Sequence, residues 1–177
     1  MMDKSENSKL PRNRIQKKAR PESRKPAVQE TKWRSAKPDA QVSELIGFLC
    51  DYCTRMPDDG KPNTGELCSS NATSGEAVVC VRALYDAKRM EKAKTSFMYT
   101  DGVDVLRAAL TTLAAIEREP QRYAYKPLQG ESPVPEHRLS LGDTAQKLFE
   151  LIERDFGPEI QELQQRLNAR NGTARRS

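Results

Sequence analysis

Four cysteines have the spacing that comes nearest to a metal site: Cys50, Cys53, Cys68 and Cys80. Cys50 and Cys53 are separated by two residues, as in a zinc knuckle, and the other two thiolates would complete a set of four ligands. Against zinc, eleven residues separate Cys68 from Cys80, and Cys53 extends the apolar stripe of an amphipathic helix. We expect reduced, buried thiols and no metal, with structural zinc as the alternative.

Few other residues suggest catalysis. His137 is the only histidine, and its proline-rich surroundings predict a solvent-facing side chain rather than half of a Cys–His pair. Asp101 and Asp104 fall at a predicted helix N-terminus, where carboxylates act as caps. Gly60 and Gly65 are not followed by the Lys-Ser or Lys-Thr of a phosphate-binding loop. We expect a protein that is not an enzyme, with no cofactor and no small-molecule substrate.

The clearest functional feature is the distribution of charge. Residues 1–38 contain twelve basic and four acidic residues, a net charge of +8, whereas the rest of the chain sums to −3. A basic arm on a mildly acidic body is typical of proteins that bind a polyanion, usually nucleic acid. Because no helix-turn-helix, zinc-finger or RNA-recognition signature is present, we expect weakly sequence-specific binding to RNA or DNA.

The arm also contains an unusual aromatic residue. In Lys32-Trp33-Arg34, an indole between two cations could stack on an unpaired base; alternatively, Trp33 folds back onto the helical body or contacts a protein partner. Residues 12–20 match a nuclear-localisation cluster, so we expect an intracellular protein that is nuclear or shuttles between nucleus and cytoplasm. The predicted nucleic-acid-binding residues are Arg12, Arg14, Lys17, Lys18, Arg20, Arg24, Lys25, Lys32, Trp33 and Arg34.

Composition predicts the fold class. Residues 1–38 contain four prolines and almost no apolar side chains, which predicts disorder. The rest of the chain has helical periodicity and almost no strand signal. The sequence therefore predicts an all-α protein: a small helical domain of four or five helices preceded by a disordered basic N-terminal arm. No apolar stretch reaches the length of a membrane span, and we expect no membrane partner.

Three helices are expected in a core domain of residues 39–119. Asp39 and Asp101 are favourable N-caps for the first and third. Thr73 begins a capping box for the second, which we expect to carry a charged, exposed tail as far as Lys94. Buried apolar stripes on all three helices would form the core.

The C-terminal part is expected to have three sections. Prolines in residues 120–139 predict an extended linker, residues 140–170 predict an amphipathic helix or helical pair, and residues 171–177 predict a disordered tail. Gly157-Pro158 favours a break into two helices. Apolar residues three and four apart are typical of a coiled-coil seam. The predicted oligomerisation residues are Phe149, Ile152, Phe156, Ile160, Leu163 and Leu167.

Two functions from different classes remain. In the first, a non-enzymatic protein contacts nucleic-acid phosphates with its arm while its helical body self-associates. In the second, the protein is a protein–protein interaction adaptor or a viral-type accessory protein, and the arm is mainly a nuclear localisation signal. Binding that weakens steeply with salt would favour the first.

Overall fold

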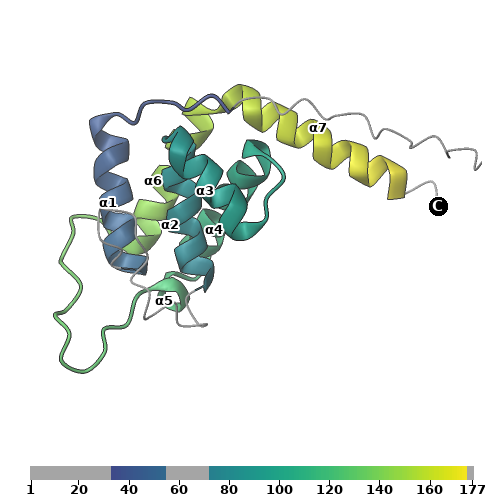
Figure 1. The fold of residues 1–177 in the computed structure, drawn as a ribbon. Helices are drawn as coiled ribbons and strands as arrows, with labels where there is room; N and C mark the ends of the chain where they lie inside the picture. The colour runs from purple at the N-terminus through teal and green to yellow at the C-terminus, as the bar shows by residue number, and fades with distance from the viewer. Residues whose placement is uncertain (1–32, 55–71, 175–177) are drawn as a thin grey trace, which may run out of the picture.

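A computed structural model describes residues 33–54 and 72–174 (Figure 1). These residues form seven helices and no strand, which confirms the all-α class but exceeds the four or five helices expected. Most of the predicted arm lies outside the described residues, as does the loop after the first helix. The helices are α1 (Ala40–Cys53), α2 (Ala72–Leu84), α3 (Ala87–Phe97), α4 (Gly102–Arg118), α5 (Pro120–Tyr123), α6 (Leu141–Asp155) and α7 (Gly157–Ala174).

Two helices begin at the capping residues that the sequence indicates, and a third is capped at the first residue of the predicted C-terminal segment. Asp39 accepts a hydrogen bond from the backbone N–H of Val42 at 2.8 Å at the start of α1. Asp101 accepts one from the N–H of Asp104 at 3.0 Å at the start of α4, and Ser140 caps α6 in the same way. Each cap satisfies a backbone donor that has no partner within the helix.

The second predicted helix is in fact two helices. Asp86 has an extended backbone conformation, and its carboxylate accepts hydrogen bonds from the N–H groups of Lys88 and Arg89. A side chain that caps a new helix ends the previous one, so the charged segment forms α3 instead of a tail of α2. The prediction of one continuous helix to Lys94 was wrong for this reason.

The structure also differs from the sequence prediction in the segment that follows α4. Pro120 ends α4, as expected, but it also begins the short helix α5, where the sequence predicted an extended linker. Proline is favourable in a first helical turn because its missing N–H would have no helical partner there. Residues 124–139, called the α5–α6 loop below, have no regular secondary structure and extend away from the helices at the lower left of Figure 1.

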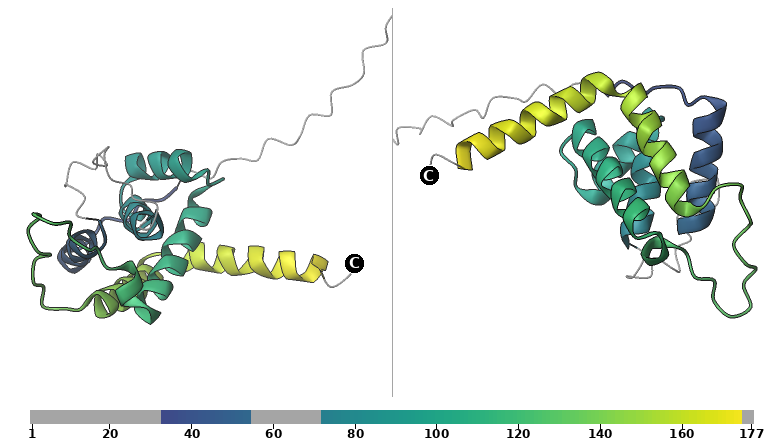
Figure 2. Two further views of the ribbon diagram at one scale, coloured as in Figure 1. Left: turned by 90° about the horizontal axis from the view of Figure 1, so that it is seen from below. Right: turned by 180° about the vertical axis from the view of Figure 1, so that it is seen from behind.

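The core is built around α4, which contacts α2, α3, α5, α6 and α7. Its predicted apolar stripe is fully buried at Leu106, Ala109, Leu113 and Ile116 and partly buried at Leu110. Helix α1 packs against α2 and α6 and closes one side of the bundle (Figures 1 and 2). Burying a leucine or isoleucine side chain stabilises the fold by about 1.5–3 kcal/mol, so this stripe makes α4 the centre of the fold.

The C-terminal segment breaks where the sequence favours it. Helix α6 ends at Asp155, and α7 begins at Gly157, with Pro158 in its first turn. Figures 1 and 2 show α7 extending away from the helical body. It continues to Ala174, beyond the point at which the sequence predicted a disordered tail.

Candidate nucleic-acid interface

The end of the basic arm is attached to the helical body through Trp33. Its indole stacks on Phe156, with ring centroids 5.5 Å apart and planes inclined by 24°. The indole N–H donates a hydrogen bond to the carbonyl oxygen of Leu84 at 3.2 Å. Trp33 therefore folds back onto the body, which was the alternative considered from the sequence. The ring is thus already packed on the body, and base stacking by Trp33 stays a prediction.

Arg34 lies across the junction of α6 and α7. Its Nε atom is 3.3 Å from Oε1 of Glu159, and its Nη2 donates to the carbonyl oxygen of Asp155 at 3.3 Å. The Arg34 side chain is 65% exposed, so its ion pair contributes little to stability. A phosphate can compete for this guanidinium without disturbing the core.

A third aromatic residue packs on Phe156. The ring of Tyr85 meets Phe156 edge-on, with centroids 5.3 Å apart, and its hydroxyl donates to Oδ2 of Asp155 at 3.0 Å. Burial, and then the negative charge of Asp155, raises the pKa of Tyr85. The phenol therefore remains a hydrogen-bond donor at physiological pH.

Residues 33–39 are attached to the body at Asp39 as well as at Trp33, and the attachment at Asp39 is an ion pair with Arg154. Arg154 donates to Oδ2 of Asp39 at 3.1 Å and to Oδ1 of Asp155 at 2.7 Å. Hydrogen bonds from the N–H of Val42 and from Arg154 lower the pKa of Asp39. Residues 33–39, called the anchor segment below, are thus fixed at Trp33 and at Asp39. In Figure 1 this segment runs along the top of the bundle from α1 towards the start of α7.

The other predicted phosphate contacts precede the anchor segment. They lie outside the described residues, and their role stays a prediction. They are Arg12, Arg14, Lys17, Lys18, Arg20, Arg24, Lys25 and Lys32.

The body has basic residues of its own on α3. Lys88 and Lys92 are exposed on this helix, whereas Met90 and Ala93 on the opposite face are fully buried. The exposed basic face that the sequence suggested in this region therefore belongs to α3.

Two of the residues predicted to form an oligomeric seam lie inside the body. Ile152 and Phe156 are fully buried, because α6 packs its apolar face against α1 and α4. An apolar repeat does not distinguish an internal core from an interface, and the role of these two side chains in oligomerisation stays a prediction. Phe149 and Ile160 are partly buried, Leu163 is 9% exposed and Leu167 is 41% exposed.

The thiols within the described residues lie in the core. Cys50, Cys53 and Cys80 are buried, and burial raises the pKa of Cys53 and of Cys80 to about 12. Among the described residues, no three His, Cys, Asp or Glu side chains are grouped as metal ligands would be. Cys68, the fourth candidate ligand, lies outside those residues.

His137 does not face solvent, contrary to expectation. Its ring stacks on Phe48 at a centroid distance of 4.3 Å and meets Tyr52 edge-on, and its side chain is 12% exposed. Its Nε2 lies 2.8 Å from Oδ2 of Asp51, although the direction is unsuitable for a hydrogen bond. The α5–α6 loop folds back onto α1 at this point, and the local proline content gave no sign of that contact.

Comparison with known proteins finds no relative: no family model, no curated protein and no solved structure matches this chain. Its function therefore has to be argued from its own residues. Within the described ranges, none of the helices combines the length and hydrophobicity needed to span a lipid bilayer.

Proposed function

We propose that this protein is a non-enzymatic nucleic-acid-binding protein whose basic arm contacts the phosphates of RNA or DNA. The observation that carries the proposal is the segregation of charge: residues 1–32 contain ten basic and four acidic residues. Binding would be driven by the release of counterions from the phosphate backbone. Such contacts position a strand without reading its bases, which accounts for weak sequence specificity.

The anchor segment supports this proposal by fixing where the arm leaves the body. Trp33 packs on Phe156 at the junction of α6 and α7. A strand held by the arm is therefore kept close to Arg34, whose exposed guanidinium can exchange Glu159 for a phosphate. Because Arg34 belongs to the same chain as the arm, its effective concentration beside the bound strand is high.

Neutralising the arm tests the proposal. The arm variant replaces Arg12, Arg14, Lys17, Lys18, Arg20, Arg24 and Lys25 by glutamine. A matched body variant neutralises seven exposed cations of the described region: Lys88, Lys92, Arg118, Arg122, Lys126, Arg138 and Lys147. Binding to a labelled 20-nucleotide RNA is measured by fluorescence anisotropy, and the same series is repeated with DNA.

We expect the arm variant to bind more than about tenfold more weakly than wild type, because several phosphate contacts are lost. The body variant should bind within a few fold of wild type. Equal binding by the arm variant and wild type would contradict the proposal. It would favour the adaptor function, in which the arm is an address signal.

Self-association through α7 would multiply the contacts of the arm. Leu167 lies on α7 and is 41% exposed, whereas Glu159 pairs with Arg34, and Arg166 pairs with Asp101 and Glu162, within the chain. Two copies of α7 packed against each other would cover Leu167. The partner proposed for this helix is therefore a second copy of the chain.

Light scattering after size-exclusion chromatography tests this association. Leu167→Glu should shift a dimer to a monomer, because it places a charge in the seam. Leu128→Glu is the control, since Leu128 is 56% exposed but lies in the α5–α6 loop. A monomeric wild-type protein, or a dimer that survives Leu167→Glu, would exclude self-association through this face.

A further inference from the structure

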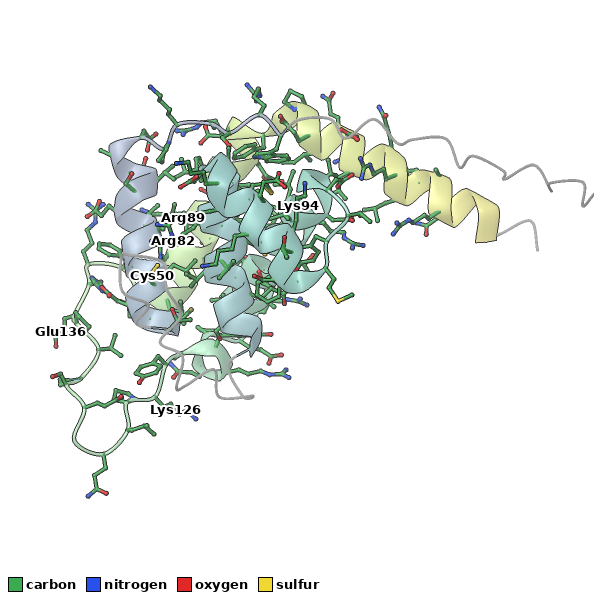
Figure 3. The ribbon with its side chains drawn as sticks, viewed as in Figure 1. Cys50, Arg82, Arg89, Lys94, Lys126 and Glu136 are labelled. Carbon is green, nitrogen blue, oxygen red and sulfur yellow. The ribbon has the colours of Figure 1, made fainter. Side chains whose placement is uncertain are left out.

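A cavity of about 970 Å³ opens between α1, the turn from α2 to α3, and the α5–α6 loop. Helix α1 contributes Ile46 and Cys50 to one side, and the loop contributes Ser132. Arg82 and Arg89 line the side formed by α2 and α3. Figure 3 shows Cys50, Arg82 and Arg89 close together on the same face of the molecule.

Its two arginines are held by separate helices. Arg82 lies in the last turn of α2, and Arg89 lies in the first turn of α3, on either side of the turn between them. Two guanidinium groups fixed in this way are suited to a phosphate monoester, because each can donate two parallel hydrogen bonds to its oxygens.

Two aspartates also line the cavity, and both have other contacts. Asp86 accepts from backbone N–H groups at the start of α3 and forms an ion pair with Arg89 at 3.4 Å. Asp51 lies 2.8 Å from Nε2 of His137. The backbone N–H groups and Arg89 offset the negative charge that Asp86 brings to the cavity.

Ser132 is the residue that can bring a phosphate to these arginines. It is exposed, and Ser132-Pro133 is the only Ser-Pro or Thr-Pro step in the 177 residues. The proline favours an extended backbone at Ser132, and an exposed, extended serine is accessible to the active site of a protein kinase.

The ends of the α5–α6 loop are attached to α1, which keeps Ser132 beside the cavity. The N–H of Tyr125 donates to the carbonyl oxygen of Tyr52 at 2.6 Å. The hydroxyl of Tyr52 donates to the carbonyl oxygen of Leu139, at the other end of the loop. Ser132 lies between these two attachments and lines the cavity beside α1.

We propose that Ser132 is a phosphorylation site and that its phosphate binds Arg82 and Arg89, closing the loop over the cavity. The phosphate donor is a nucleoside triphosphate bound by a protein kinase. The bond between Ser132 Oγ and the terminal phosphorus forms as the bond from that phosphorus to its bridging oxygen breaks. The nucleoside diphosphate leaves with the electron pair, and the kinase takes the hydroxyl proton. The product brings nearly two negative charges and three acceptor oxygens to the arginines.

The first test concerns modification. The full chain is incubated with a purified proline-directed protein kinase and ATP, and phosphopeptides are mapped by mass spectrometry. We expect one phosphate per chain at Ser132 and none in Ser132→Ala. Failure to modify Ser132 in the folded protein would overturn the assignment of this site.

The second test concerns the arginines and uses phosphoserine inserted at position 132 during synthesis. The ³¹P NMR signal is titrated with pH in the folded chain and in urea. We expect the midpoint in the folded chain to be lower by about 0.5–1 pH unit, because nearby cations favour the dianion. Arg82→Gln/Arg89→Gln should remove this difference, and each single variant should reduce it if the double variant does not fold.

A control protein carries Gln129→phosphoserine in the same loop, because Gln129 does not line the cavity. Its midpoint should be the same in the folded and unfolded chain. Equal folded and unfolded midpoints at position 132, or a difference that survives removal of both arginines, would overturn the proposal. Neither test depends on the binding of nucleic acid.

Discussion

Gly102 lies so close to the ring of Trp33 that a Cβ atom at position 102 would overlap the indole. The two residues are far apart in the sequence, yet the first residue of α4 leaves the space that the arm's only tryptophan fills. Glycine is tolerated here because it stands at the end of a helix rather than inside it. The anchor segment is therefore part of the packed fold.

Gly102→Ala should destabilise the protein by about 1–3 kcal/mol, because the added methyl group displaces Trp33 from its site. The emission of the single tryptophan should shift to longer wavelength in the native state. Urea unfolding followed by circular dichroism measures the change in free energy of unfolding.

The matched control is Gly47→Ala in α1, where no atom lies within 4 Å of the added Cβ. It should stabilise the protein by about 0.5–1 kcal/mol, the usual gain when alanine replaces glycine inside a helix. Changes of the same sign at both positions would show that Trp33 does not restrict position 102.

At Met98, unlike at Gly102, the substitution of a single residue should stabilise the protein. It ends α3 in the left-handed conformation, with φ of 58° and ψ of 36°, and its side chain is 90% exposed. Met98→Gly should raise the free energy of unfolding by about 0.5–1 kcal/mol, since glycine adopts this conformation without steric cost. Met98→Ala keeps the strain and should have almost no effect. A loss of stability in the glycine variant would mean that the exposed side chain makes a favourable contact.

The buried thiols should react slowly in the folded protein. In Cys50→Ser/Cys68→Ser only Cys53 and Cys80 remain, and burial raises the pKa of both to about 12. Because the thiolate is the reactive form, a disulfide reagent at pH 8 should label neither within minutes, and should label both at once in urea. Rapid labelling of the native protein would contradict the burial of these side chains.

Asp101 should make stability depend on pH in a defined direction. Burial alone would raise its pKa, but hydrogen bonds from Arg166 and from the N–H of Asp104, with the charge of Arg166, lower it overall. The stabilising contribution is therefore present at neutral pH and is lost as the pH falls below about 3.9, the value in an unfolded chain.

Asp101→Asn keeps an N-cap but removes the ion pair, in which Asp101 Oδ2 and Arg166 Nη1 are 2.6 Å apart. It should cost about 1 kcal/mol at pH 7, since the pair is partly exposed to solvent, and much less at pH 3. Arg166→Gln should cost at least as much, because it also removes the ion pair with Glu162, and the double variant should cost no more than Arg166→Gln alone. A difference that is as large at pH 3 as at pH 7 would exclude the ion pair as its cause.

Local signals in the sequence predicted the features that depend on neighbouring residues. Asp39 and Asp101 are recognisable as caps because a cap acts within three residues, and the break at Gly157 follows from the chemistry of proline. The break between α2 and α3 was missed because Asp86 lies within an otherwise helical pattern.

The candidate site was harder to predict because it depends on distant contacts. Trp33 contacts Leu84, Gly102 and Phe156, and no sequence pattern around residue 33 indicates these partners. His137 was misassigned for the same reason, since Phe48 and Asp51 approach the α5–α6 loop from α1. The apolar spacing of Phe156 was visible in the sequence, but burial in this chain and burial against a second chain give the same spacing.

The most direct test of the central claim is the salt dependence of nucleic-acid binding, measured for the full chain and for a chain that begins at Trp33. We expect the logarithm of affinity for a single-stranded RNA to fall linearly with the logarithm of salt concentration, with a slope of about −4 to −6 if six to eight cations contact phosphates. The shortened chain, which keeps the anchor segment, should show little binding and almost no slope. A shallow slope for the full chain, or equal binding by the shortened chain, would contradict the account.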